Sequence, residues 1–148
     1  MRRGSTGSAD GMPISHRVDR ESRLVVAVGH GTMTDSDVFG YQRDVWSLPE
    51  VRGFSELIDM TGVTTIALPS GDRVRDLAEL AASMDDSAEG SRFAIVAPAD
   101  LAFGLGRMFQ SYRSVMNNSR KQVGVFRTME EALAFLGVEG PIRMPEIE

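Results

Sequence analysis

The chain has no cysteine, a single lysine and only two histidines among its 148 residues. Without cysteine there is no disulfide, no thiolate nucleophile and no cysteine-ligated metal, a pattern typical of cytoplasmic proteins. His16 and His30 are far apart, and neither has a companion at the spacing of metal ligands. Because few nucleophiles or bases remain, we expect no metal site and no cofactor, and an enzyme is the least favoured class of function.

Long apolar runs are also missing. The longest unbroken aliphatic run is Leu24 to Val28, far short of the roughly 20 residues that span a bilayer, so we expect no transmembrane segment. The first twelve residues, MRRGSTGSADGM, have two arginines but no apolar stretch after them, which argues against a secretory signal. Their Gly, Ser and Thr content predicts a disordered leader over residues 1–12.

The net charge of −5 is unevenly distributed. Between Asp100 and Arg127 one acidic residue stands against five basic ones. The simpler interpretation is a solvated helix face with a cationic helix end, and the alternative is a patch for an anion or an acidic partner. Nucleic acid is not an expected partner, because the patch is small and lacks interleaved aromatics. We expect Asp85 and Asp86 to be solvated in a linker.

Hydrophobic periodicity divides residues 13–137 into five strands and four helices. The strands are expected at 14–19, 23–29, 54–60, 93–97 and 123–126, and the helices after Thr34, at 72–84, from Asp100 and after Thr128. The order ββαβαβαβα predicts a single α/β domain around a five-stranded mixed sheet, with the first two strands antiparallel and the rest mostly parallel. Residues 138–148 are expected to form an extended C-terminal tail.

Loops beyond the carboxyl ends of parallel strands are the usual place for binding. Gly29-His30-Gly31 stands between a predicted strand and helix, as in dinucleotide-binding turns, but the third glycine position is Thr34 and acidic residues follow it. We therefore interpret it as a tight turn. The polar stretch 61–71 is predicted to be a functional loop.

The third helix is predicted to bury a stripe made of Leu101, Leu105, Met108, Tyr112 and Val115. Gly104 and Gly106 each cost about 1 kcal/mol relative to alanine inside a helix, which indicates a compensating close approach. Arg107 follows them. It is predicted either to hold an anionic group or pair with Asp59 or Asp100, or to anchor the helix to the sheet by a salt bridge.

The element order, the phrase ELIDMTGVT, and the run RFAIVAPADLAFGLGRMFQ followed by VGVFRTMEEALAFL resemble the SpoIIAA-like family of STAS-type domains. The resemblance covers roughly residues 14–136. It implies a STAS-like fold, related in shape to the CRAL-TRIO lipid-binding domains. Members of this family are largely of unknown function, with an apolar-ligand pocket or a partner-protein role suspected.

Better-known STAS domains, the anti-sigma-factor antagonists, carry a phosphorylatable serine in an Asp-Ser-Ser-Gly turn. The corresponding turn here is Leu68-Pro69-Ser70-Gly71, in which only Ser70-Gly71 matches. The resemblance thus names Ser70 as a possible phosphorylation site, while the missing acid and the proline argue against that role. The simpler interpretation is that Ser70 caps the following helix.

The sequence therefore favours a non-catalytic, STAS-like binding or regulatory module for a small apolar or amphipathic ligand, held between the third helix and the sheet. The predicted binding residues are Asp59, Thr61, Pro98, Asp100, Phe103, Arg107 and Phe109. A partner-switching regulator acting through the Ser70 loop is the alternative, and an enzyme comes last. Phe39 and Trp46 are predicted to be exposed on the first helix, where they could form the face of a homodimer.

Overall fold

The computed structural model describes residues 13–67, 70–85, 90–116 and 121–146. Its sheet has five strands in the order β2-β3-β4-β5-β6, with β2 antiparallel to β3 and every other pair parallel. The strands are β2 (Ile14–Asp19), β3 (Leu24–Thr34), β4 (Ser55–Ala67), β5 (Arg92–Val96) and β6 (Gln122–Phe126). The helices are α1 (Asp35–Trp46), α2 (Gly71–Ser83), α3 (Asp100–Ser114) and α4 (Met129–Leu136), with a short 3₁₀ turn, η2 (Pro49–Val51). The predicted fold class is confirmed.

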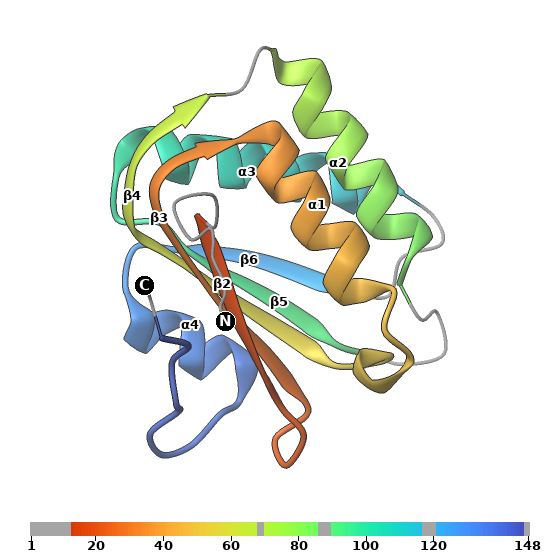
Figure 1. Cartoon of the computed structure of the whole chain (residues 1–148), viewed down its shortest axis with the longest axis vertical. Helices are drawn as coiled ribbons and strands as arrows, with labels where there is room; N and C mark the ends of the chain where they lie inside the picture. The colour runs from red at the N-terminus through yellow and green to blue at the C-terminus, as the bar shows by residue number, and fades with distance from the viewer. Residues whose placement is uncertain (1–12, 68–69, 86–89, 117–120, 147–148) are drawn as a thin grey trace, which may run out of the picture.

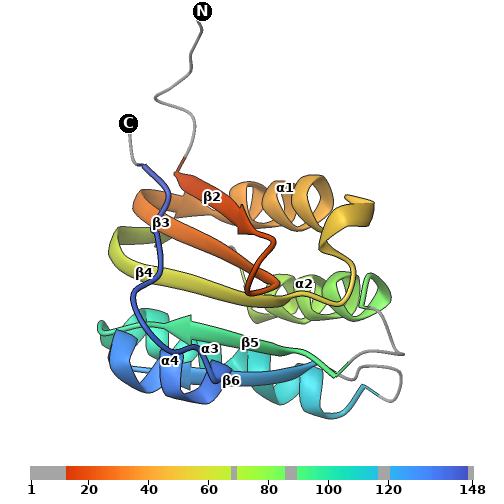
Figure 2. The same ribbon diagram turned by 90° about the horizontal axis from the view of Figure 1, so that it is seen from below.

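Helices cover both faces of the sheet (Figures 1 and 2). On one face α2 and α3 contribute Val74, Ala78 and Phe109 to the largest buried cluster, which also contains Ile58 and Ile95 of the central strands. On the other face α4 buries Ala132 in a second cluster, and the tail residues Val138, Ile142 and Met144 pack against it. No helix in the described part of the chain is long and apolar enough to cross a bilayer.

Local signals placed the helix ends well. Thr34 and Asp37 form the predicted capping box of α1, with Thr34 Oγ1 accepting from the Asp37 amide at 3.2 Å and Asp37 Oδ2 accepting from the Thr34 amide at 2.9 Å. Thr128 caps α4, with its Oγ1 accepting from the Glu131 amide at 3.2 Å. Gly137 ends α4 in the left-handed conformation, with φ of 73°.

The predicted turn at Gly29-His30-Gly31 and the predicted loop from residue 61 are both wrong. Strand β3 continues to Thr34 and β4 to Ala67, and the two remain paired through two register shifts, beside His30 and beside Gly31. Such bulges bend a strand pair sharply, and Gly31 supplies the required φ of 68°. The paired ends therefore curl over the face of the sheet that α1, α2 and α3 cover, toward α1 and α2 (Figure 1).

The predicted apolar stripe of α3 is confirmed only at Leu105 and Tyr112, which pack partly buried against the core. Leu101, Met108 and Val115 are 61%, 38% and 74% exposed, whereas Ala102, Gly106, Phe109 and Arg113 are the buried residues. A Cβ built on Gly106 would lie 3.0 Å from Val125 Cγ1. The small residues Ala102 and Gly106 thus bring α3 close to the sheet, and Leu101, Met108 and Val115 are left at the surface. The expectation that Met108 belongs to the core is wrong.

Candidate functional site

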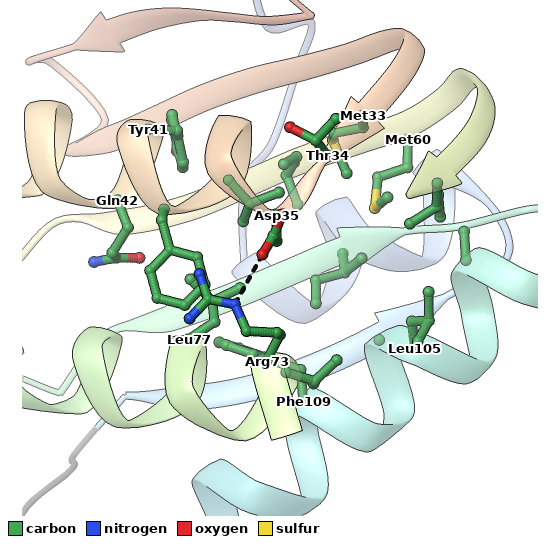
Figure 3. Close-up of a pocket in the computed structure, with 18 of the residues that line it drawn as sticks. Met33, Thr34, Asp35, Tyr41, Gln42, Met60, Arg73, Leu77, Leu105 and Phe109 are labelled. Carbon is green, nitrogen blue, oxygen red and sulfur yellow. Dashed lines mark hydrogen bonds and ion pairs between the residues drawn. The ribbon is translucent and has the colours of Figure 1, made fainter. Parts of the chain in front are cut away.

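A cavity of about 110 Å³ lies between the sheet and helices α1, α2 and α3, beside the curled ends of β3 and β4 (Figure 3). Its walls are mainly apolar. The lining includes Met33, Val38, Ile58, Met60, Ile66, Leu77, Ile95, Leu105 and Phe109. The strand extensions that the sequence did not predict supply Met33 and Ile66, so the bulged strand pair is what closes this side of the cavity.

An ion pair joins α1 to α2 at the edge of the cavity. Arg73 Nε donates to Asp35 Oδ2 at 2.8 Å, as the dashed line in Figure 3 shows, and Arg73 Nη1 lies 3.5 Å from Asp76 Oδ2. The Arg73 guanidinium also lies 4.2 Å from the centre of the Phe39 ring. The hydrogen bond from Arg73 holds the pKa of Asp35 below its ordinary value. A charged pair thus bridges two helices at the apolar cavity.

The cavity has a second polar edge, formed by Tyr41 and Glu56. The Tyr41 hydroxyl donates to Glu56 Oε2 at 2.8 Å, and Glu56 is only 4% exposed. Lys121 Nζ lies 3.8 Å from Glu56 Oε1 and 3.7 Å from the centre of the Trp46 ring. Burial raises the pKa of Glu56 and lowers the pKa of Lys121. The same burial, with the Glu56 carboxylate beside it, raises the pKa of Tyr41 well above its ordinary value.

A second buried ion pair lies close to Glu56. Arg113 of α3 donates to Asp85, and the two side chains are 3% and 7% exposed. The prediction that Asp85 is solvated is therefore wrong, whereas Asp86 lies outside the described residues. The positive charge of Arg113 acts together with that of Lys121 to hold down the pKa of Glu56 against the effect of burial.

Among the predicted binding residues, Phe109 alone lines the cavity. Four others gather at the start of α3, where Arg127 Nη1 donates to Pro98 O at 2.9 Å and to Asp100 Oδ1 at 2.8 Å and its guanidinium lies 4.0 Å from the Phe103 ring. Arg107 is exposed there, 6.0 Å from the same ring. Asp100 thus pairs with Arg127, and within the described residues no ion pair is found at Arg107.

Asp59 and Thr61 form a separate local unit on β4. Asp59 Oδ1 accepts from the Thr61 amide at 3.0 Å and from its hydroxyl at 2.6 Å. Side chains of a strand alternate between its two faces, so Glu56 and Ile58 on the cavity side are out of phase with Asp59. The carboxylate that the strand delivers to the cavity is therefore Glu56.

Phe39, Trp46 and Ser70 on the helices differ from what the sequence predicts. Phe39 is 8% exposed and packs beneath Arg73, so the prediction that it is exposed on a dimer face is wrong. Trp46 is partly buried against Lys121. Ser70 is exposed at the N-cap position of α2, but its side chain makes no capping hydrogen bond. In the described part of the chain, no group of three or more His, Cys, Asp or Glu residues is placed to hold a metal ion.

Sequence reasoning missed Tyr41, Glu56, Asp35 and Arg73. The one local signal is Glu56, a charged residue next to the apolar Leu57 and Ile58 of a central strand, where a buried acidic side chain requires a partner. Its partners come from α1 and from Lys121 just before β6, which no short-range pattern reveals. Arg73 and Asp35 likewise meet only because α1 and α2 lie side by side.

Comparison with known proteins supports the fold. The chain is similar to a solved structure from Shewanella loihica PV-4, described as an uncharacterized protein of the DUF3478 family with a SpoIIAA-like fold. The TM-score is 0.53 at 17% sequence identity, and the match covers 83% of this chain and 93% of that one. No protein-family model matches the sequence, and no curated protein matches it either. The predicted SpoIIAA-like, STAS-type fold is therefore confirmed at the level of structure.

Proposed function

We propose that this protein is a non-catalytic, STAS-like binding module that takes up a small apolar or amphipathic molecule in the cavity beneath α1, α2 and α3. The cavity itself is the observation that carries this proposal. The cavity is partly open to solvent and lined mainly by apolar side chains, and a concave apolar surface of this kind is the usual form of a small-molecule site. An apolar cavity of roughly 150 Å³ binds benzene, so about 110 Å³ suits a molecule with a single ring.

The edge of the cavity supports uptake from solvent. Asp35 and Arg73 join α1 and α2 by an ion pair, and the side chain of Arg73 is 36% exposed. An interaction of this kind, near solvent, is weak and breaks readily. Separation of the two helices by a small movement would admit a ligand without unfolding the sheet.

Toluene is a suitable probe because it fits the size and polarity of the cavity. We expect toluene to shift the methyl NMR signals of Ile66 and Leu77, which line the cavity, and to leave Ile142 on the α4 face unchanged. Ala102→Met should fill the cavity and abolish the shifts. Ala134→Met, the same change at an exposed position of α4, is the matched control. Unchanged methyl signals up to saturating toluene would contradict the proposal.

Ser70 supports a second candidate function, a partner-switching regulator. Its exposed hydroxyl makes no capping bond at the start of α2, and the Arg73 amide already donates to Ser70 O at 3.2 Å. A phosphate there would meet free amides and the positive end of the helix dipole. Phosphopeptide mapping of protein purified from its native cells tests this role, with Ser70→Ala as the control. If no phosphate is found on Ser70, the partner-switching role is excluded.

A further inference from the structure

Glu56 is a buried carboxylate on the wall of a mainly apolar cavity. An ionised carboxylate offers about four acceptor sites. The contacts described for it are a hydrogen bond from Tyr41, an interaction with the Trp46 side chain, and an ion pair with Lys121 at 3.8 Å, a separation longer than a hydrogen bond. A ligand with a hydroxyl group would therefore find an acceptor there, and its own polar group would not be left unpaired in the cavity.

Charge and size restrict the ligand further. The charged residues on the cavity wall are Asp35, Glu56 and Arg73, and Arg73 is already paired with Asp35 and Asp76. Lys121 balances Glu56 from outside the cavity wall. A ligand carboxylate would thus face Glu56 among mainly apolar side chains, where like charges repel more strongly than in water. The volume of about 110 Å³ leaves room for a single ring.

We propose that the natural ligand is an uncharged, ring-sized amphipathic molecule with one hydroxyl group, of the phenol type, which donates its O–H to Glu56 beside Tyr41. This inference rests on the proposed binding function and gives it a specificity. Transfer from water alone favours toluene over phenol, because the phenol hydroxyl must lose its hydrating water. Tighter binding of phenol than of toluene therefore requires a polar anchor in the cavity.

The probes are phenol, toluene and benzoate, titrated against the full-length protein by the methyl shifts of Ile66 and Leu77. We expect phenol to bind about tenfold more tightly than toluene, since hydrogen bonds to charged groups are the stronger class, and benzoate not to bind. Tighter binding of toluene than of phenol would overturn the inference while leaving the proposed function intact. The absence of shifts with all three probes would overturn both.

Variants of Glu56 and its partners test whether Glu56 accepts the hydrogen bond from the ligand hydroxyl. The double variant Glu56→Gln/Lys121→Met removes the carboxylate together with its counter-charge, and we expect it to abolish the preference for phenol while toluene still binds. Glu79→Gln, on the exposed side of α2, should keep the preference. If the double variant does not fold, Tyr41→Phe frees Glu56 Oε2 and should enlarge the advantage of phenol. An unchanged phenol-to-toluene ratio in Tyr41→Phe or in the double variant would overturn the inference.

Discussion

The Tyr41 hydroxyl donates a hydrogen bond of 2.8 Å to Glu56 Oε2 and so joins helix α1 to the central strand β4. Trp46, one turn further along α1, donates from Nε1 to the same hydroxyl at 3.4 Å, and its ring covers Lys121. Buried polar groups that satisfy one another in this way fix the position of the elements that carry them. The contact holds α1 over the sheet and, with it, one wall of the cavity.

The Glu56–Lys121 pair should be sensitive to the loss of one member. Lys121→Met leaves the Glu56 carboxylate buried with less compensating charge, and we expect a loss of about 3–5 kcal/mol in the free energy of unfolding. Adding Glu56→Gln should restore most of it, because no buried charge then lacks its partner. Urea unfolding of the two variants measures both effects. Equal stabilities of Lys121→Met and the unmodified protein would show that the pair is not desolvated.

The raised pKa of Glu56 predicts how stability depends on pH. Its ordinary value is 4.5, and burial places the folded-state pKa above that. Between the two values the folded protein binds a proton that the unfolded chain does not, so the free energy of unfolding falls as pH rises through this window. We expect Glu56→Gln/Lys121→Met to lack this decline. Parallel urea titrations from pH 4.5 upward test the sign, and a rise in stability over that window would refute it.

The parts of the fold that depend on short-range chemistry follow from the sequence. The capping box at Thr34, the Thr128 cap of α4 and the left-handed Gly137 need only residues within one turn of each other. The extension of β3 and β4 could not be predicted in this way, since a polar strand end such as Thr61–Ala67 is stable only when its partner continues beside it. Its β-branched residues were the signal that was overlooked.

The site was predicted poorly for a related reason. In α3 the large apolar residues predict the buried face only in part. Ala102 and Gly106 allow the close packing, Leu105 and Tyr112 pack beside them, and Leu101, Met108 and Val115 are exposed. The position of Arg107 after two glycines predicts a binding role, but the two glycines have different surroundings. A Cβ on Gly106 would meet the sheet, whereas a Cβ on Gly104 meets nothing within 4 Å. Apart from the acidic Glu56 in a buried strand, no local signal indicates that Tyr41, Glu56 and Lys121 come together from three separate segments.

The Arg73–Asp35 pair should control how fast a ligand enters and leaves. Arg73→Ala removes both the link to Asp35 and the guanidinium that covers Phe39, so we expect faster exchange of bound toluene with little change in the cavity itself. Line broadening of the toluene signals in NMR measures the exchange rate. Arg75→Ala on the exposed side of the same helix is the control, because Arg75 does not line the cavity. Identical exchange rates in the two variants would show that the ligand uses another route.

The two glycines of α3 offer an internally matched test of its packing. A Cβ on Gly104 meets nothing within 4 Å, so Gly104→Ala should gain about 1 kcal/mol in the free energy of unfolding from helix propensity alone. A Cβ on Gly106 would lie 3.0 Å from Val125 Cγ1 and 3.7 Å from Ile95 Cγ2, both on the sheet. Because β-branched side chains in a strand have few rotamers, α3 itself must move away, and such overpacking costs about 1–3 kcal/mol. We therefore expect Gly106→Ala to be the less stable variant in urea unfolding, and an equal gain in both would mean that α3 does not rest closely on β5 and β6.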